Sequence, residues 1–320
     1  MDIYFLGAGA SHAGGLPVLK ETLSFMLECP EIYNFLVKIF NVQKDQGKEL
    51  LPSLDDVYSL IDFALFHDQN LGPFRQEELR SVRKKLNLSI CRLFAQDSKQ
   101  IDYQKAVKMY TTFAQQLSWD TSVVLSLNWD TALDFCLEKI MGWPLDYGVG
   151  EKQKKSYPLL KLHGSINWAW CDSCSQMTVV GYRFADWIRA SCSVCGDRAL
   201  HPMLIGPTTF PRHHYIPVEQ IWQQALQYIL RAKRLYFIGW SLDSIDLGAL
   251  ALVKRGLLLN KHNPQLYVLG HGLDGSYTRE KLLSNSTVKG YLQFFGGKVK
   301  FKMDGFQGFI PCEEDFITID

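Results

Sequence analysis

Four cysteines stand in two Cys-x-x-Cys pairs, and this spacing predicts a metal site. Cys171 pairs with Cys174 and Cys192 with Cys195, with seventeen residues between the pairs. Two such turns can fold together and present four thiolates as a tetrahedron, the closed and soft ligand set that suits structural zinc. Because sulfur fills every position, we expect no catalysis at this metal. A redox pair is a minor alternative, because it would need only one of the two turns.

Polar side chains follow two short apolar runs, at points where buried strands would end. "SLNWD" carries Asn128 and Asp130, and "KLHGS" carries His163. Open α/β sheets bind ligands at the carboxyl ends of their strands. Asn128 or Asp130 could instead cap a following helix. His163 has the near-neutral reference pKa of a proton acceptor, although a lone histidine is more often structural.

A third apolar run continues as "FIGWSLD", which carries Gly239, Ser241 and Asp243. Gly239 and Ser241 could line a phosphate or a ribose in front of a helix. The structural alternative is that Ser241 or Asp243 caps that helix.

The first run leads into the glycine-rich stretch "FLGAGASHAGGLP". Gly7 and Gly9 let the backbone approach a ligand, Ser11 adds a hydroxyl, and a following helix would attract phosphate groups. The common dinucleotide fingerprint G-x-G-x-x-G fails here, because His12 stands at its third glycine. A tight strand-to-helix turn without a ligand is the alternative.

Strand and helix patterns alternate along the chain. This alternation predicts an α/β fold, with a Rossmann-like, mainly parallel sheet and helices on both faces. The apolar runs expected as strands are Asp2–Leu6, Ser122–Leu127, Tyr157–Leu162, Arg234–Gly239 and Gln265–Gly270.

Two stretches interrupt this alternation, and they divide the expected domains. Residues 30–119 read as an inserted helical module, and residues 168–200 form the small zinc-binding module. The Rossmann-like domain would then comprise residues 1–29, 120–167 and 201–320.

The bulk composition excludes several classes of protein. The 320 residues are 47% hydrophobic and 21% charged, with a formal net charge of +1, as in an ordinary globular protein. The basic runs Arg83–Lys85 and Glu151–Lys155 are too short for a nucleic-acid groove, so we expect no direct nucleic-acid binding. The first apolar run is too short for a signal peptide or membrane span. We therefore expect a cytoplasmic protein without membrane contact.

In content and in order, these motifs resemble those of the sirtuin family. The family's G-A-G-x-S loop, which runs on to G-I-P, is matched by "GAGAS" and by "GLP" at Gly15–Pro17. Its T-Q-N-x-D motif corresponds to "SLNWD", its H-G motif to His163 and Gly164, and its G-T-S-L motif to "GWSL". The two cysteine pairs lie between the last two motifs, as in the family.

The resemblance implies an enzyme whose substrate NAD lies in an extended cleft and loses its nicotinamide through an oxocarbenium-like transition state. Asn128 would position a water and the nicotinamide ribose, Asp130 would organise the nicotinamide end, and His163 would be the general base. The residues implied in NAD binding are Gly7, Ala8, Gly9, Ser11, Pro17, Asn128, Asp130, Gly239 and Ser241.

Three segments depart from the deacylating sirtuins. Val18–Lys20 replaces their D-F-R, His201–Tyr215 replaces a strand that ends in F-G-E, and "SLDSID" replaces an apolar stretch. A proline-rich loop at 201–215 would be a poor edge strand for peptide binding. These departures resemble the divergent bacterial branch found in anti-phage systems, whose members hydrolyse NAD and work as oligomers or beside a partner ATPase or other sensor protein.

Three functions follow from these observations. We expect first an NAD hydrolase that acts in anti-phage defence, forms a homo-oligomer and depends on structural zinc. The second is an NAD-dependent protein lysine deacylase, which the intact cysteine pairs favour. The third is a non-catalytic sensor of NAD or ADP-ribose.

Overall fold

The computed structural model describes residues 1–43, 50–149, 155–207, 216–273 and 278–319, which group into two compact units. Unit 1 comprises Met1–Leu16, Asp102–His163 and Tyr215–Asp320, and unit 2 comprises Pro17–Ile101 and Gly164–His214. The division into three parts drawn from the sequence has other boundaries and stays a prediction.

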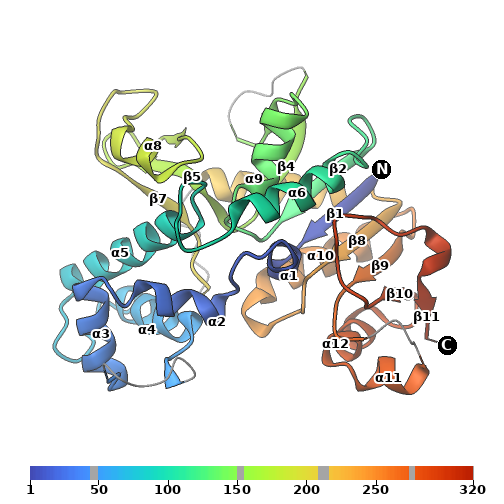
Figure 1. Ribbon diagram of the computed structural model, residues 1–320, viewed down its shortest axis with the longest axis horizontal. Helices are drawn as coiled ribbons and strands as arrows, with labels where there is room; N and C mark the ends of the chain where they lie inside the picture. Colours follow the sequence, from blue (N-terminus) through green and yellow to red (C-terminus); the bar gives the residue numbers. More distant parts are fainter. Residues whose placement is uncertain (44–49, 150–154, 208–215, 274–277, 320) are drawn as a thin grey trace. The chain divides into compact units, whose positions relative to one another are not determined.

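Unit 1 is built on a sheet whose eight described strands run in the order β11-β10-β9-β8-β1-β2-β4-β3 (Figure 1). All neighbouring strands pair in parallel except β11, which is antiparallel to β10. The strands are β1 (Asp2–Leu6), β2 (Ser122–Ser126), β3 (Leu145–Asp146), β4 (Tyr157–Lys161), β8 (Arg234–Ile238), β9 (Gln265–Leu269), β10 (Val299–Lys302) and β11 (Ile317–Thr318). The mainly parallel sheet expected from the sequence is confirmed.

Helices cover both faces of this sheet, which explains why its central strands carry buried apolar residues on both faces. On one face Tyr4 of β1 packs against Phe113 of α6, and on the other Phe237 of β8 packs against Tyr291 of α12. The helical elements of unit 1 are α1 (Ala8–Ala13), α6 (Tyr103–Ala114), α7 (Ala132–Phe135), the π-helical turn η3 (Cys136–Ile140), α9 (Ile216–Ile229), η4 (Ser244–Asp246), α10 (Leu247–Leu259), α11 (Arg279–Ser284), α12 (Ser286–Phe295) and η5 (Glu313–Asp315).

A row of stacked tyrosines marks the register of the central strands. Tyr4 lies beside Tyr236, which lies beside Tyr267, with ring centroids 5.1 and 4.8 Å apart. The next residue on β1 and β8, Phe5 and Phe237, points to the opposite face, as strand geometry requires. This register brings the carboxyl ends of β1, β8 and β9 to one edge of the sheet.

The last eighty residues contain more sheet than their sequence indicates. The apolar pattern predicts only the strand at Gln265–Gly270, whereas β10 and β11 extend the sheet beyond β9. Both strands are short, four and two residues, so neither leaves a long apolar run in the sequence. They pair because β9 presents a free edge.

Unit 2 combines helices with a small antiparallel sheet. Its sheet has the strand order β6-β5-β7, and α5 packs against β7 and β5 as well as α3 and α4. Its elements are α2 (Leu19–Thr22), η1 (Leu23–Met26), α3 (Pro30–Phe40), α4 (Leu54–Phe66), α5 (Gln76–Phe94), β5 (Gly164–Cys171), β6 (Met177–Val179), α8 (Phe184–Arg189) and β7 (Leu200–Leu204). Helices α3, α4 and α5 confirm the helical character expected for this part of residues 30–119.

The segment from His201 onward begins as a strand, and the expectation of a loop is wrong for its first part. Residues 201–204 belong to β7, which pairs with β5 along one side only. Pro202 is tolerated because proline has no N–H group to donate, and on an edge strand the outward side needs no such donor. Residues 208–215 of this segment lie outside the described residues.

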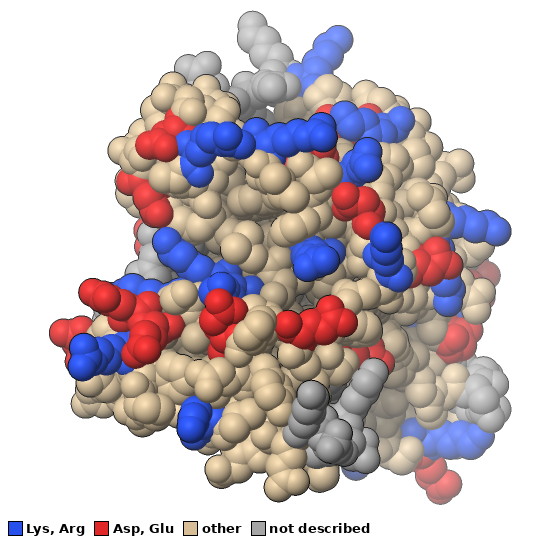
Figure 2. Space-filling view, turned by 60° about the vertical axis from the view of Figure 1, so that its left-hand side comes forward, with Lys and Arg blue, Asp and Glu red and all other residues tan. Residues whose placement is uncertain are grey.

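Charged side chains of both signs are spread over the face shown in Figure 2. The basic run on α5 is matched by acids of the same unit: Arg83 pairs with Asp62, and Lys85 with Glu31 at 2.8 Å. Of the second run, only Lys155 lies within the described residues. Among the described helices, none has the length and apolar character that a membrane span requires.

The loops after β1 and β8 touch at a point where only glycine fits. The Gly9 N–H donates to the Gly239 carbonyl at 2.8 Å, and a Cβ on Gly239 would lie 2.1 Å from the Ala10 nitrogen. Gly239 also has φ of +64°, a conformation that L side chains rarely adopt.

Gly239→Ala should therefore destabilise the protein by more than the ~1–3 kcal/mol of backbone strain alone. Urea unfolding followed by tryptophan fluorescence measures this change. Gly297→Ala is the matched control, because its φ is not positive and the nearest neighbour of its added Cβ is the Ile319 carbonyl oxygen at 3.7 Å. Equal stability of the two variants would contradict the steric explanation.

Candidate functional site

The candidate site lies where the strand order of unit 1 reverses. From β1 the chain moves to β2 and then β4 on one side, and it later returns to β8 on the other side of β1. The chain thus continues from β1 to β2 on one side and from β8 to β9 on the other, and in open α/β sheets a ligand binds in the crevice at such a point. The candidate residues Gly7 to Ser11, Asn128, Asp130, His163, Gly239 and Ser241 all belong to unit 1. Pro17 is the first residue of unit 2.

The glycine-rich stretch is mostly helix, with little open loop. Helix α1 begins at Ala8, directly after the single residue that follows β1. The N–H groups of Gly7 and Gly9 donate to the carbonyls of Ile238 and Gly239, at 2.9 and 2.8 Å. These glycines hold two loops together. Ala8 is exposed and is the first helical residue, whose N–H has no acceptor within a helix.

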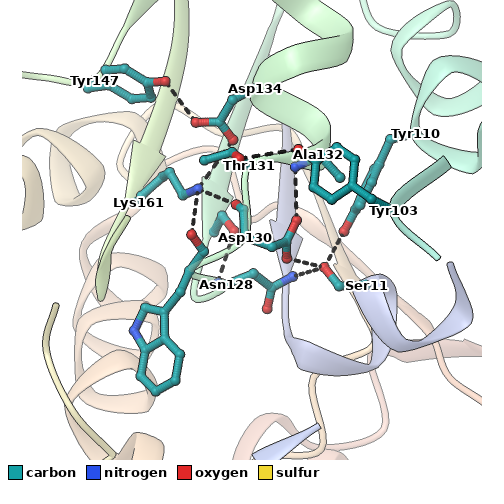
Figure 3. Close-up of polar contacts among 12 residues, drawn as sticks. Ser11, Tyr103, Tyr110, Asn128, Asp130, Thr131, Ala132, Asp134, Tyr147 and Lys161 are labelled. Carbon is teal, nitrogen blue, oxygen red and sulfur yellow. Dashed lines mark hydrogen bonds and ion pairs between the residues drawn. The ribbon is translucent and has the colours of Figure 1, made fainter. Parts of the chain in front are cut away.

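Ser11 is the centre of a buried polar cluster (Figure 3). Its hydroxyl donates to Asp130 Oδ2 at 2.6 Å and accepts from Asn128 Nδ2 at 2.9 Å. The Tyr110 hydroxyl lies 2.8 Å from the same oxygen. Since the single Ser11 proton goes to Asp130, Tyr110 must be the donor in that contact. Ser11 is 5% exposed, and these three bonds use its full hydrogen-bonding capacity.

This cluster fixes the orientation of the Asn128 amide. Nδ2 donates to both the Gly7 carbonyl, at 3.0 Å, and the Ser11 hydroxyl. A flipped amide would place Oδ1 against two acceptors, so the contacts exclude the flip. Figure 3 shows Oδ1 pointing away from the cluster, and no described residue donates to it. Asn128 thus offers an acceptor to a water or a hydroxyl.

Asp130 is 6% exposed, and both of its carboxylate oxygens accept hydrogen bonds from other residues of the protein. Oδ2 accepts from Ser11, and Oδ1 accepts from the Ala132 N–H at 3.1 Å, at the start of α7. The N-cap residue of α7 is Thr131, so Asp130 does not occupy the cap position; it lies one residue before the cap and accepts from the first helical N–H. Burial raises the pKa of Asp130, against the opposing effects of Lys161 and of the two hydrogen bonds.

His163 follows β4, the strand next to β2, and is half-buried. Its carbonyl accepts from Trp129 Nε1 at 3.1 Å, which ties this turn to the loop that carries Asn128. Burial lowers the pKa of the His163 imidazole to about 4, although a backbone hydrogen bond with Leu127 opposes the change. The ring is therefore neutral near pH 7 and able to accept a proton.

The loop after β8 presents Ser241 at the surface, while its neighbours are anchored. Trp240 Nε1 donates to Asp246 at 2.9 Å, and the Tyr291 hydroxyl donates to the Trp240 carbonyl at 3.0 Å. Burial raises the pKa of Asp246 to about 6. Asp243 occupies the N-cap position of η4 without a side-chain capping bond. Ser241 is therefore exposed at the candidate site.

Three residues that support the site were missed in the sequence. Tyr110 lies on the buried face of α6, where a tyrosine reads as one more apolar residue. Lys161 and Asp134 form a buried ion pair with a 3.2 Å separation. The available signal was a lysine inside the otherwise apolar run "YPLLKL", where a charge needs a partner.

The four paired cysteines of unit 2 come together as expected. Their Sγ atoms all lie within 4.8 Å of one another, with Cys171 to Cys195 at 3.6 Å and Cys174 to Cys192 at 3.5 Å. All are free thiols. A tetrahedral zinc with Zn–S bonds of about 2.3 Å separates its sulfurs by about 3.8 Å, so the residues fit this ion. Four cysteine ligands would give zinc a structural role.

The two cysteine turns are built alike. The N–H of Ser175 donates to the Cys171 carbonyl and that of Gly196 to the Cys192 carbonyl, both at 2.9 Å. Ser175 and Gly196 each follow the second cysteine of a turn and each have positive φ, +54° and +77°. The same backbone turn thus presents each pair of thiols.

Several solved Sir2 structures are similar to this chain. A Sir2 homolog–NAD complex is 14% identical, with a TM-score of 0.48 over 96% of this chain and 84% of that one. A mutant Sir2 homologue–ADP-ribose complex is 13% identical, with a TM-score of 0.47 over 96% and 87%. Sir2Tm bound to a propionylated peptide is 13% identical, with a TM-score of 0.43 over 85% and 82%.

No protein-family model matches the chain, and no curated protein matches it.

We expect the purified protein to hold about one zinc ion per chain, because four thiolates in a tetrahedron bind zinc strongly. Elemental analysis by mass spectrometry measures the content. Cys174→Ser should lose most of the zinc, whereas Cys312→Ser should keep it, because Cys312 is exposed and outside the cluster. Full zinc content in the Cys174 variant would contradict the assignment.

Proposed function

We propose that this protein is a sirtuin-like enzyme that hydrolyses NAD to ADP-ribose and nicotinamide. The observation that carries the proposal is the fixed orientation of the Asn128 amide. Its Nδ2 is hydrogen-bonded inside the protein, so its Oδ1 can accept a hydrogen bond from a ligand at the point where the strand order reverses. The neutral His163 on the next strand adds a proton acceptor. The ordered sequence motifs supply the identity of the substrate.

The reaction follows from these groups. The bond between the ribose anomeric carbon and the nicotinamide nitrogen breaks, and its electron pair leaves with nicotinamide. A water held by Asn128 Oδ1 adds its oxygen to the oxocarbenium carbon, and His163 accepts the released proton. In this proposal Ser11, itself hydrogen-bonded to Tyr110, holds the Asn128 side-chain amide in position. Ser241 and Ala8 would contact NAD. The reaction needs neither a metal nor a covalent protein nucleophile.

A protein lysine deacylase is the second candidate. The edge strand β7 favours it, because an extended peptide can add to a free strand edge. Val18–Lys20, in place of the deacylases' D-F-R, favours hydrolysis instead. The replacement of D-F-R by Val18–Lys20 also supports a role in anti-phage defence. We further propose that the protein forms a homo-oligomer and acts beside a partner ATPase or sensor protein.

Mass spectrometry of NAD incubated with the protein in H₂¹⁸O distinguishes the two reactions. Hydrolysis should give ADP-ribose with ¹⁸O at the anomeric carbon without any peptide. A deacylase should need an acyl-lysine peptide and give O-acyl-ADP-ribose. The hydrolase proposal fails if an assembled, active preparation forms only the second product.

Asn128→Ala and His163→Ala should each lower kcat at least about 100-fold, the size expected when a positioned acceptor or a general base is removed. Zinc content should stay near wild type, while Asn128→Ala should lower the unfolding midpoint because it leaves the Gly7 carbonyl and Ser11 without a donor. His262→Ala is the matched control, because His262 is exposed and lies after α10, away from the motif loops. Unchanged turnover in the first two variants would reject their roles.

The low pKa of His163 sets the expected pH dependence. If the general base had the ordinary histidine pKa, kcat/KM would fall to half of its maximum near pH 6.5, because half of the base would be protonated. His163 should instead stay unprotonated, and active as a base, down to about pH 4. Because the unfolded chain binds this proton more readily, stability should fall as the pH decreases from about 6.5 to 4. NMR of ¹³C-labelled histidine, assigned with His163→Asn, measures the value directly. A midpoint near 6.5 would contradict the prediction.

A further inference from the structure

Lys161 is a fully buried cation at the carboxyl end of β4. Its side chain is 1% exposed, among the largest fully buried side chains of the described residues. A buried ammonium needs an opposite charge and an acceptor for each of its three protons. Asp134, at 2% exposure, supplies the charge at 3.2 Å. The Tyr147 hydroxyl donates to the other oxygen of Asp134 at 2.7 Å and holds the carboxylate in place.

The remaining protons of Lys161 go to the loop that carries the candidate catalytic residues. Nζ donates to the Asp130 carbonyl at 2.5 Å and makes a longer contact of 3.4 Å with the Trp129 carbonyl. These carbonyls belong to the two residues that follow Asn128. Figure 3 shows the Lys161 amine between Asp134 and this loop.

The same lysine also lies two residues before His163 on the chain. The Leu162 N–H between them donates to the Ser126 carbonyl at 2.8 Å, so the end of β4 is fixed against the end of β2. One side chain thus connects the backbone of the Asn128 loop to the turn that presents His163. A neutral side chain of the same length would keep the packing and lose this connection.

We propose that Lys161 is a positioning residue, with Asp134 as its counter-ion, that fixes the loop of Asn128 and Asp130 relative to His163. The catalytic part of this proposal rests on the proposed NAD hydrolysis. The geometric part stands on the contacts alone.

The test compares Lys161→Met with the double variant Lys161→Met/Asp134→Asn. The single variant leaves Asp134 as an unpaired buried charge, so its unfolding midpoint should fall strongly. The double variant removes that charge, so the midpoint should recover most of the loss. If the ion pair served folding only, turnover would recover as well. We expect kcat in the double variant to stay at least 30-fold below wild type, with KM for NAD within threefold.

A more exposed ion pair at the opposite edge of the sheet, in which Arg234 also contacts Glu313, provides the control. Arg234 donates to Asp2 at 2.6 and 2.9 Å, at the amino ends of β8 and β1. Arg234→Met/Asp2→Asn should change stability and leave kcat within twofold of wild type. An equal loss of kcat in both double variants would overturn the positioning role.

The NMR signals of the Asn128 side-chain amide provide a readout that does not depend on turnover. In the Lys161→Met/Asp134→Asn variant they should shift or broaden, and in the Arg234→Met/Asp2→Asn variant they should match wild type. Unchanged Asn128 signals in the first variant would overturn the inference. Wild-type protein that leaves NAD intact would instead reject the proposed function, and the NMR result would still decide the role of Lys161.

Discussion

The common register of the parallel strands is the constraint on which the rest of unit 1 depends. Tyr4, Tyr236 and Tyr267 stack side by side because β1, β8 and β9 are aligned residue for residue. The alignment makes β1, β2, β4 and β8 end at one edge, although their loops lie up to some two hundred residues apart in sequence. A slip of one residue would move a loop by about 3.3 Å and turn its strand's side chains to the wrong face.

At that edge, some of the motif residues use all their hydrogen-bond donors and acceptors inside the protein, and others do not. Ser11 uses its proton and both lone pairs inside the protein, so it orients Asn128 and has no capacity left for a ligand. The N–H groups of Gly7 and Gly9 donate to the carbonyls of Ile238 and Gly239, at the end of β8 and in the loop after it. Asn128 Oδ1 has no donor among the described residues, and Ser241 is exposed, so both are free to meet the ligand of the proposed reaction. The glycine-rich motif thus joins two loops and orients Asn128, and its part in NAD binding stays a prediction.

The strands and the motif residues could be predicted from the sequence because each leaves a local pattern. Buried parallel strands read as apolar runs, and paired cysteines keep their spacing. Tyr110 and Asp134 leave no such pattern, since their roles depend on which distant residue they meet. A tyrosine on the apolar face of α6 looks like core until Ser11 is placed beside it. The short strands β10 and β11 form because a neighbouring edge is free, which no local pattern records.

The charges around Asn128 suit a reaction that develops positive charge on a sugar ring. A cation near that carbon would oppose an oxocarbenium ion, yet a buried cation, Lys161, lies behind the loop. Asp134 balances it, so the Lys161–Asp134 pair carries no net charge. Burial raises the pKa of Asp130, and Lys161 opposes this increase. The ion pair can therefore hold the loop without adding positive charge to the site.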